Sequence, residues 1–230
     1  FVIIVDDFTR YVMLKFVSTK EINTVGTFIA YSMKWMLNIT STKPSIIRCD
    51  NGKEFVNRPM ISFLEDQGIQ VELTVPYLPE MNGVAERMNR SLKTKAATIF
   101  LPTGTSNSKI IFDKAVEWAV YLKNRIPGTN NSKTTFELLF NRPPDISRLK
   151  KFGSDVLEKL ASQKIQQLHL PKCHNSIIAA VIDGYTDNRN AYQCWYYKDK
   201  SFVVAIHNDI EWLDSFLFAK LGEALILNIP

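Results

Sequence analysis

Two acidic residues, Asp50 and Glu86, stand at positions where a carboxylate could take part in chemistry. Asp50 follows a short apolar segment, 45–49, that is predicted to be a strand, and a turn comes directly after it. Open α/β sheets place their ligands at the carboxyl ends of strands. Glu86 lies in the first turn of a helix that is predicted over residues 83–100. The two carboxylates are far apart in the sequence, so only the fold can bring them together.

The helix that carries Glu86 is predicted to be amphipathic, with one apolar stripe along it. The residues of the stripe are Val84, Met88, Leu92, Ala96 and Ile99. Glu86 falls on the opposite side, and Arg90 and Lys93 share its face at i+4 and i+7. Two interpretations fit this face: a solvated surface with an i,i+4 Glu–Arg pair, or a carboxylate flanked by cations that bind a polyanion.

Residues 1–145 are predicted to mix an antiparallel hairpin with alternating strands and helices. Apolar runs at 1–5 and 11–17 predict the hairpin, with a polar turn between them. Helices are predicted at 21–37, 60–67, 83–100, 110–125 and 135–140, and further strands at 45–49 and 70–75. This order is typical of an α/β fold in which helices flank a mixed sheet.

The character of the sequence changes after Pro143-Pro144. Strands predicted at 152–156, 177–185, 192–197 and 202–206 indicate a small, mostly β C-terminal module over residues 146–215. Residues 216–230 are predicted to be a tail. The expected domains are therefore 1–145, 146–215 and this tail.

Composition sets broad limits on function. The chain has 230 residues, of which 46% are hydrophobic and 22% charged, as in ordinary globular proteins. A net charge of +5 permits a polyanionic partner without demonstrating one. No apolar run is long enough to span a membrane, so no membrane partner is expected. The three cysteines form no pair motif, which favours a reduced, intracellular setting.

A zinc site is the other possibility that the cysteines raise. The candidate ligands are His169, Cys173, His174 and Cys194. Their spacing matches no common zinc finger, so no zinc is expected.

The residues around both carboxylates match motifs of a known family. Residues 49–55, CDNGKEF, resemble the DNG-x-E-[FY] motif of retroelement integrases, and residues 75–90 resemble their P-[YH]-x-P-x-x-N-G-V-[AS]-E-R motif. Residues 115–127, 135–138 and 149–153 then resemble later motifs of the copia branch in the same order, with Thr135 in place of a usual proline. The resemblance to copia-type retrotransposon integrases covers about residues 1–212.

This resemblance implies an RNase H-like catalytic core from a Pol polyprotein. Three carboxylates of the family hold two Mg²⁺ or Mn²⁺ ions that support polynucleotidyl transfer, which comprises 3′-end processing and strand transfer into target DNA. Asp50 matches the second of these catalytic metal ligands and Glu86 the third. The residues then expected to contact DNA are Tyr77, Asn82, Arg87, Arg90 and Lys93.

The family's first catalytic aspartate is missing from this sequence. Its D-x-x-G-P context does not occur, and Asp6 and Asp7 match the family's D-D-x-[ST]-R-Y turn instead. We therefore expect a sheet that lacks its first strand, in a chain that begins after it, and a copy that is inactive. The alternatives are a non-catalytic, nucleic-acid-binding remnant of a transposable element and a cellular RNase H-like nuclease. The ordered copia motifs argue against the nuclease.

The same resemblance implies partners and a location. Intact members act on retroelement ends and target DNA as homo-oligomers. They work in the nucleus and also occur in cytoplasmic virus-like particles. These remain expectations from the family, since neither composition nor spacing indicates them.

Overall fold

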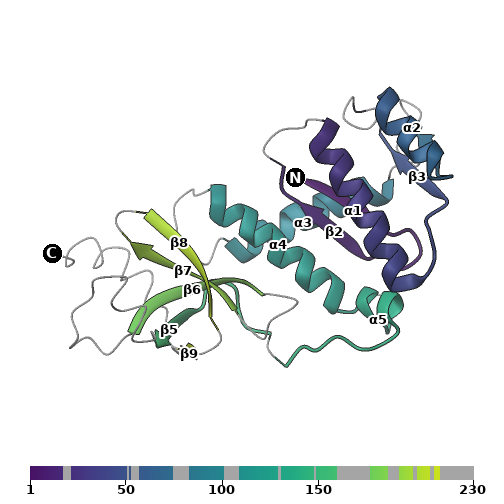
Figure 1. Cartoon of the computed structure of the whole chain (residues 1–230). Coiled ribbons are helices and arrows are strands. Elements are labelled where there is room, and N and C mark those ends of the chain that lie inside the picture. The colour runs from purple at the N-terminus through teal and green to yellow at the C-terminus, as the bar shows by residue number, and fades with distance from the viewer. Residues whose placement is uncertain are drawn as a thin grey trace. The chain divides into compact units, whose positions relative to one another are not determined.

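A computed structural model describes residues 1–17, 22–50, 52, 57–74, 83–100, 109–128, 131–147, 149–159, 177–185, 192–198, 201–207 and 210–212 (Figure 1). The helices are α1 Ile22–Thr40, α2 Arg58–Asp66, α3 Gly83–Phe100, α4 Lys109–Arg125 and α5 Thr135–Phe140. The strands are β1 Val2–Val5, β2 Val12–Lys15, β3 Ile46–Cys49, β4 Gln70–Leu73, β5 Asp155–Lys159, β6 Ile177–Tyr185, β7 Tyr192–Lys198, β8 Ser201–His207 and β9 Ile210–Trp212.

These elements fall into two compact units, and neither unit is continuous in sequence. The first comprises Phe1–Thr94 with Val120–Ile146, and the second comprises Lys95–Ala119 with Ser147–Pro230. The helices α3 and α4 therefore each contribute residues to both units. The domain boundaries expected from composition, at 145 and 215, stay a prediction.

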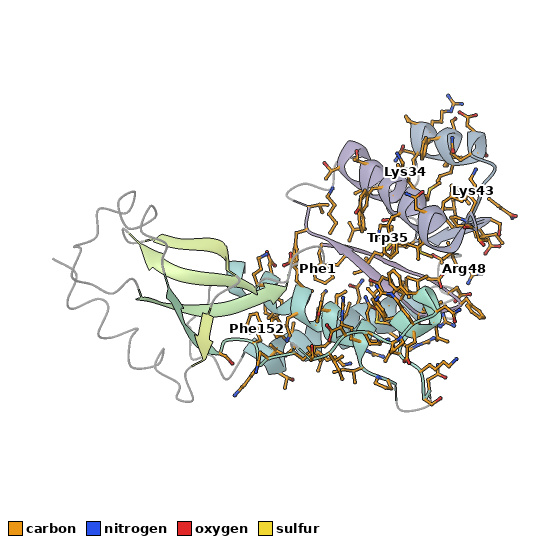
Figure 2. All side chains as sticks on the ribbon, turned by 60° about the horizontal axis from the view of Figure 1, so that its bottom comes forward. Phe1, Lys34, Trp35, Lys43, Arg48 and Phe152 are labelled. Atoms are coloured by element: carbon orange, nitrogen blue, oxygen red, sulfur yellow. The ribbon has the colours of Figure 1, made fainter. Side chains whose placement is uncertain are left out.

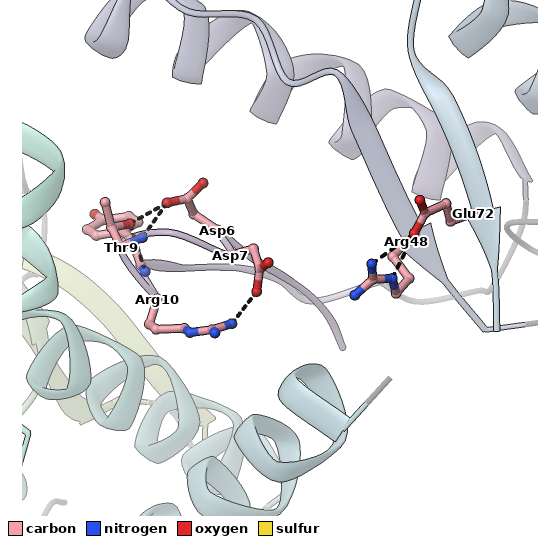
Figure 3. A network of polar contacts seen from close by, with 7 residues as sticks. Asp6, Asp7, Thr9, Arg10, Arg48 and Glu72 are labelled. Atoms are coloured by element: carbon pink, nitrogen blue, oxygen red, sulfur yellow. Dashed lines mark hydrogen bonds and ion pairs between the residues drawn. The ribbon is translucent and has the colours of Figure 1, made fainter. Parts of the chain in front are cut away.

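The described strands of the first unit form two separate two-stranded sheets. Strands β1 and β2 pair antiparallel with Val5 opposite Val12, which confirms the predicted hairpin. Strands β3 and β4 pair parallel with Ile47 beside Val71. The Arg48 side chain donates to Glu72 Oε2 at 2.8 and 3.0 Å, which ties β3 to β4 (Figure 3).

Both sheets pack against one hydrophobic core. The buried side chains of this core are Val2, Val25, Phe28, Ile29, Met60, Leu64 and Ile69. Ile4 of β1, Ile47 of β3 and Val71 of β4 pack against them, so strands of both sheets meet the helices α1 and α2. Among the described strands, β1 does not pair with β3, so the hairpin and the β3–β4 pair form separate sheets.

The ends of α2 show how local sequence sets these elements. Asn57 caps the N-terminus by accepting from the Met60 amide at 2.9 Å. At the other end Gly68 has a φ of +68°, and its amide and that of Ile69 donate to Glu65 and Leu64 carbonyls. This is a Schellman motif, and it ends α2 close to the predicted end of the helix at residue 67.

A buried asparagine, Asn124 near the end of α4, closes the outer edge of β2. Its Oδ1 accepts from the Val12 amide at 3.0 Å and its Nδ2 donates to the Val12 carbonyl at 2.8 Å. The carboxamide thus satisfies both backbone groups of Val12, as a neighbouring strand would. Thr135 Oγ1 adds contacts of 3.2 and 3.3 Å to the Asn124 carbonyl oxygen and Oδ1.

Aromatic packing joins the hairpin, α1 and α5. Tyr11 stacks on Trp35 with ring centroids 5.7 Å apart, and Phe140 meets both rings edge-on at 5.8 Å. Phe136 stacks on Phe140 at 4.3 Å. Trp35, labelled in Figure 2, therefore packs within the first unit.

The start of α5 is a capping box built on Thr134 and Glu137. Thr134 Oγ1 accepts from the Glu137 amide at 3.0 Å, and the Thr134 amide donates to Glu137 Oε2 at 2.7 Å. Hydrogen bonds from the Thr134 backbone, and then from its side chain, lower the pKa of Glu137. A carboxylate whose pKa is lower in the folded state stabilises the fold above its unfolded pKa, and that contribution is lost as pH falls through the folded pKa.

We therefore expect Glu137→Gln to flatten the acid limb of the stability profile. Urea midpoints measured between neutral pH and the acid side of the usual glutamate range should fall less steeply for this variant than for the unchanged chain. Glu65→Gln, an exposed position on α2 away from the capping box, is the control and should leave the slope as it was. Identical profiles for the two variants would contradict the assignment.

The second unit holds a five-stranded antiparallel sheet in the order β8-β7-β6-β5-β9. Three of its strands lie where they were predicted, within one residue at each end. The strand predicted at 152–156 is instead β5, Asp155–Lys159. Phe152 lies in a turn because its buried ring packs edge-on against Trp118 at 5.4 Å, and Gly153 has a φ of +75° that an extended strand cannot adopt.

Candidate functional site

Asp50 lies directly after β3, at the carboxyl end of a strand, as the sequence predicted. Its side chain is exposed, and Oδ1 accepts from the Gly52 amide at 3.1 Å. Burial, and then the charge of Asp50, raises the pKa of the neighbouring Cys49 thiol. The thiol is therefore poorly suited to act as a nucleophile. Of these two neighbouring residues, Asp50 is the candidate for a functional role.

Glu86 lies in the first turn of α3 and is also exposed. A carboxylate at this position is favoured by the partial positive charge of the helix N-terminus. Leu92 and Ala96 are fully buried on the other side of the helix, whereas Arg90 and Lys93 are exposed. The predicted amphipathic character of this helix is thus confirmed, with Glu86 and the two cations on its solvent side.

The predicted DNA-contacting residues differ in what surrounds them. The Arg87 guanidinium folds back over Gly83, where an added Cβ would lie 2.6 Å from Nη1. Lys93 Nζ lies 5.9 Å from the centroid of the Phe1 ring, a cation–π contact with the start of the hairpin. Tyr77 and Asn82 lie outside the described residues.

Asp6 and Asp7 are engaged within the hairpin turn (Figure 3). Asp6 Oδ2 accepts from the amide and hydroxyl of Thr9 at 2.7 and 2.6 Å, and the Asp7 carboxylate pairs with Arg10. Arg10 itself has a left-handed φ of 61°. These contacts give both carboxylates a turn-forming role, in agreement with their D-D-x-[ST]-R-Y context.

The two acidic side chains of the site are of a chemical type that can bind divalent metal ions. Asp50 and Glu86 are hard oxygen donors of the type that Mg²⁺ and Mn²⁺ prefer. In the part of the chain that the structure describes, no three His, Cys, Asp or Glu side chains gather closely enough to hold an ion. A complete three-carboxylate set is therefore not found among these residues.

No helix in the described part of the chain is both long enough and apolar enough to cross a membrane.

Sequence reasoning missed Asn124 as a key polar residue. It noted the residue only as part of a motif, although its side chain is 3% exposed and makes three hydrogen bonds. The sequence did contain a signal for this buried residue. Asn124 follows Val120 and Val116 at intervals of four residues, so it lies on an apolar face of its helix. A buried carboxamide must have partners, because an unpaired one is costly.

The sequence of this chain is similar to a known domain family and to known polyproteins. Residues 1–79 match the Integrase core domain family. The chain is 29% identical over 198 residues to the Retrovirus-related Pol polyprotein from transposon TNT 1-94 of Nicotiana tabacum, covering 85% of this chain and 14% of that protein. It is 30% identical over 195 residues to the polyprotein from transposon RE2 of Arabidopsis thaliana, covering 84% of this chain and 13% of that protein.

A solved structure shares the fold. The chain matches, with a TM-score of 0.51 and 16% identity, a chain of the simian T-cell lymphotropic virus intasome in complex with PP2A regulatory subunit B56 gamma. The match covers 91% of this chain and 70% of that one. The class that these comparisons show is that of the Integrase core domain, whose family model matches residues 1–79. More particularly, the chain is related to the integrase region of copia-type retrotransposon Pol polyproteins, which confirms the resemblance carried by its motifs.

Proposed function

We propose that this chain is the DNA-handling part of a retroelement integrase, a polynucleotidyl transferase that joins element ends to target DNA. The match to the Integrase core domain and the similarity to two plant Pol polyproteins support this proposal most strongly. Asp50 after β3 and Glu86 in the first turn of α3 are its proposed catalytic residues. The chain spans about one seventh of these polyproteins, so the reaction belongs to a larger protein than residues 1–230.

Asp50 and Glu86 would supply two of the three carboxylates that hold a pair of Mg²⁺ or Mn²⁺ ions. When bound, such ions activate an attacking oxygen and stabilise the leaving oxygen at a phosphodiester. The chain's own part is to present two exposed carboxylates, Asp50 and Glu86. Because the D-x-x-G-P context of the family's first catalytic aspartate does not occur in the sequence, we propose that residues 1–230 alone bind DNA without cutting it.

The solvent side of α3 would grip the phosphate backbone. Arg90 and Lys93 are exposed on it beside Glu86, and Arg87 lies at its N-terminal end. Lysine and arginine contacts to phosphate position DNA without reading its sequence. Tyr77 and Asn82 precede this helix and are proposed as further contacts. In the larger protein we propose action on element ends and target DNA, homo-oligomerisation and a nuclear location.

Reversing both α3 cations should weaken DNA binding strongly. Arg90→Glu with Lys93→Glu is expected to lower affinity for a short duplex by about ten- to a hundredfold at low salt, and to reduce the slope of log K against log salt by about 2. Fluorescence anisotropy across a salt series measures both quantities. Lys34→Glu, at an exposed cation on α1, is the matched control for the single Lys93→Glu variant, because each changes the net charge by the same amount. Equal effects of the α3 and α1 reversals on the slope would contradict a phosphate contact at α3.

The catalytic proposal has its own test. Purified residues 1–230 should show no Mg²⁺- or Mn²⁺-dependent strand cleavage or strand transfer on labelled element-end duplexes. Cleavage that disappears in Glu86→Gln would show that the chain completes its own metal site, and would overturn the non-cutting proposal while supporting the role of Glu86. DNA binding by the same preparation serves as the control for a folded protein.

A further inference from the structure

The exposed face of β3 carries a cation, Arg48, close to Asp50. Ile46, Arg48 and Asp50 are exposed, and the residues between them, Ile47 and Cys49, are half-buried. Side chains alternate along a strand in this way, so Arg48 and Asp50 lie on one face, with their Cα atoms about 7 Å apart. Ile47 packs against the buried cluster that contains the core residues of α1. The face of Arg48 and Asp50 is therefore turned away from α1.

Glu72 of β4 holds the Arg48 guanidinium in a defined place. The two residues are partners in the parallel ladder, and Arg48 Nε and Nη2 donate to Glu72 Oε2 at 3.0 and 2.8 Å (Figure 3). Among the described residues, Arg48 Nη1 has no hydrogen-bond partner, so its donors remain for another acceptor. A side chain that is already held in place loses less conformational entropy when it binds a ligand.

The cation is the more exposed partner of this pair. The side chain of Arg48 is 46% exposed and that of Glu72 is 30% exposed. A ligand that approaches this face from solvent therefore meets the guanidinium more readily than the carboxylate. The planar guanidinium is suited to phosphate, because its parallel N–H groups match two phosphate oxygens at once.

A purely structural ion pair between β3 and β4 is the competing explanation. Exposed pairs of this kind contribute little to stability, because solvent screens them and two long side chains must be ordered. The structural role accounts for the two hydrogen bonds to Glu72. The position of Arg48, on the face of Asp50 and near the carboxyl end of a strand, gives its remaining donors a second role.

From these observations we propose that Arg48 contacts a backbone phosphate of the DNA that lies at Asp50, and that Glu72 is a positioning residue for the guanidinium. This contact rests on the proposed function and adds to it a cation from β3, apart from the cations of α3. Phosphate contacts set the position of DNA without reading its bases. Arg48 thus helps to set where the backbone lies relative to Asp50.

Arg48→Gln in the 230-residue chain tests the contact, with duplex binding measured by fluorescence anisotropy over a salt series. The variant should bind about tenfold more weakly at low salt. The slope of log K against log salt should fall by about 1, and the loss should be equal on two duplexes of unrelated sequence. Lys34→Gln is the matched control, because it removes the same charge from an exposed position on α1, on the opposite side of β3 (Figure 2).

Two further variants separate contact, positioning and folding. Arg48→Lys keeps the charge and a donor for Glu72, so it should keep the slope that Arg48→Gln loses. Glu72→Gln should make the Arg48 Nε–H group more mobile in NMR relaxation, whereas Glu65→Gln on α2 should leave it unchanged. In the unchanged chain, added duplex should shift the Arg48 Nε–H signal, which a purely structural pair would not do.

The outcomes distinguish this contact from the proposed function. If the chain binds duplex but Arg48→Gln and Lys34→Gln have the same slope, the Arg48 contact is wrong and the proposed function stands. If Arg48→Lys loses the slope as fully as Arg48→Gln, the change reports damaged folding and the contact is again wrong. An unchanged chain that binds no duplex would overturn the proposed function and the Arg48 contact together.

Discussion

Asn124→Asp is expected to destabilise the first unit by about 3–5 kcal/mol at neutral pH. The substitution hardly changes the shape of the side chain. It replaces the Nδ2 donor with a carboxylate oxygen that faces the Val12 carbonyl, at a position where the asparagine bond is 2.8 Å. The charge would also be buried, since Asn124 is 3% exposed. The expected loss of stability therefore has two sources: a hydrogen bond to the Val12 carbonyl that is no longer made, and a buried charge without a partner.

The stability deficit of Asn124→Asp should also depend on pH. Burial and the facing carbonyl would raise the pKa of the introduced carboxyl group. Below that raised pKa the protonated acid can donate to the Val12 carbonyl again, so the deficit relative to the unchanged chain should shrink as pH falls. Urea unfolding of both chains over a pH series measures the deficit.

A matched control is Asn131→Asp, which makes the same chemical change at an exposed position. It should stay within about 0.5 kcal/mol of the unchanged chain at every pH. If Asn124→Asp were as mild as this control, the carboxamide could not be what holds α4 to β2.

Trp118→Ala is expected to cost about 3–5 kcal/mol and to loosen the second unit. The indole is 3% exposed and meets the Phe152 ring at 5.4 Å with an interplanar angle of 69°, an edge-to-face contact. Its removal leaves a cavity beside the Phe152 ring, which the methyl group of alanine cannot fill. Near-UV circular dichroism and urea unfolding together report the lost packing.

The conservative variant makes this prediction specific. Trp118→Phe keeps an aromatic ring near Phe152 and should lose clearly less stability than Trp118→Ala. Tyr31→Ala removes a large aromatic side chain that is 61% exposed on α1, and it should cost no more than about 0.5 kcal/mol. A Trp118→Ala loss as small as that of Tyr31→Ala would show that the Trp118–Phe152 contact contributes little.

Local sequence predicted most elements, because their signals are local. Helix α3 starts at Gly83 and ends at Phe100 as its apolar periodicity predicted, and α5 follows its capping box on Thr134. Strand pairing was harder to predict, since it joins distant segments. The hydrogen bonds between Asn124 and Val12 join residues 112 positions apart in the sequence, and no local pattern predicts them. Strand β5 was misplaced because the apolar Phe152 contributes to a core contact rather than to a strand.

The sequence predicted which strand and which helix carry the residues of the candidate site. Asp50 after a strand and Glu86 in a first helical turn both follow from local pattern and motif. Their approach to a shared metal pair stays a prediction, because it depends on the path of the chain between β4 and α3. The turn role of Asp6 followed from its motif, and its bonds to Thr9 give that role a physical basis.

The division of α3 and α4 between two units limits how this protein can be dissected. A shortened version that starts at residue 146 would keep the strands of the second unit but discard Lys95–Ala119, and with it Ala115, Val116 and Trp118. A version that stops at residue 145 would keep those helical residues and strip away the Phe152 ring that covers Trp118. Loss of function in either truncation would thus report a damaged interior rather than the location of an activity, and point substitutions are the sounder way to map one.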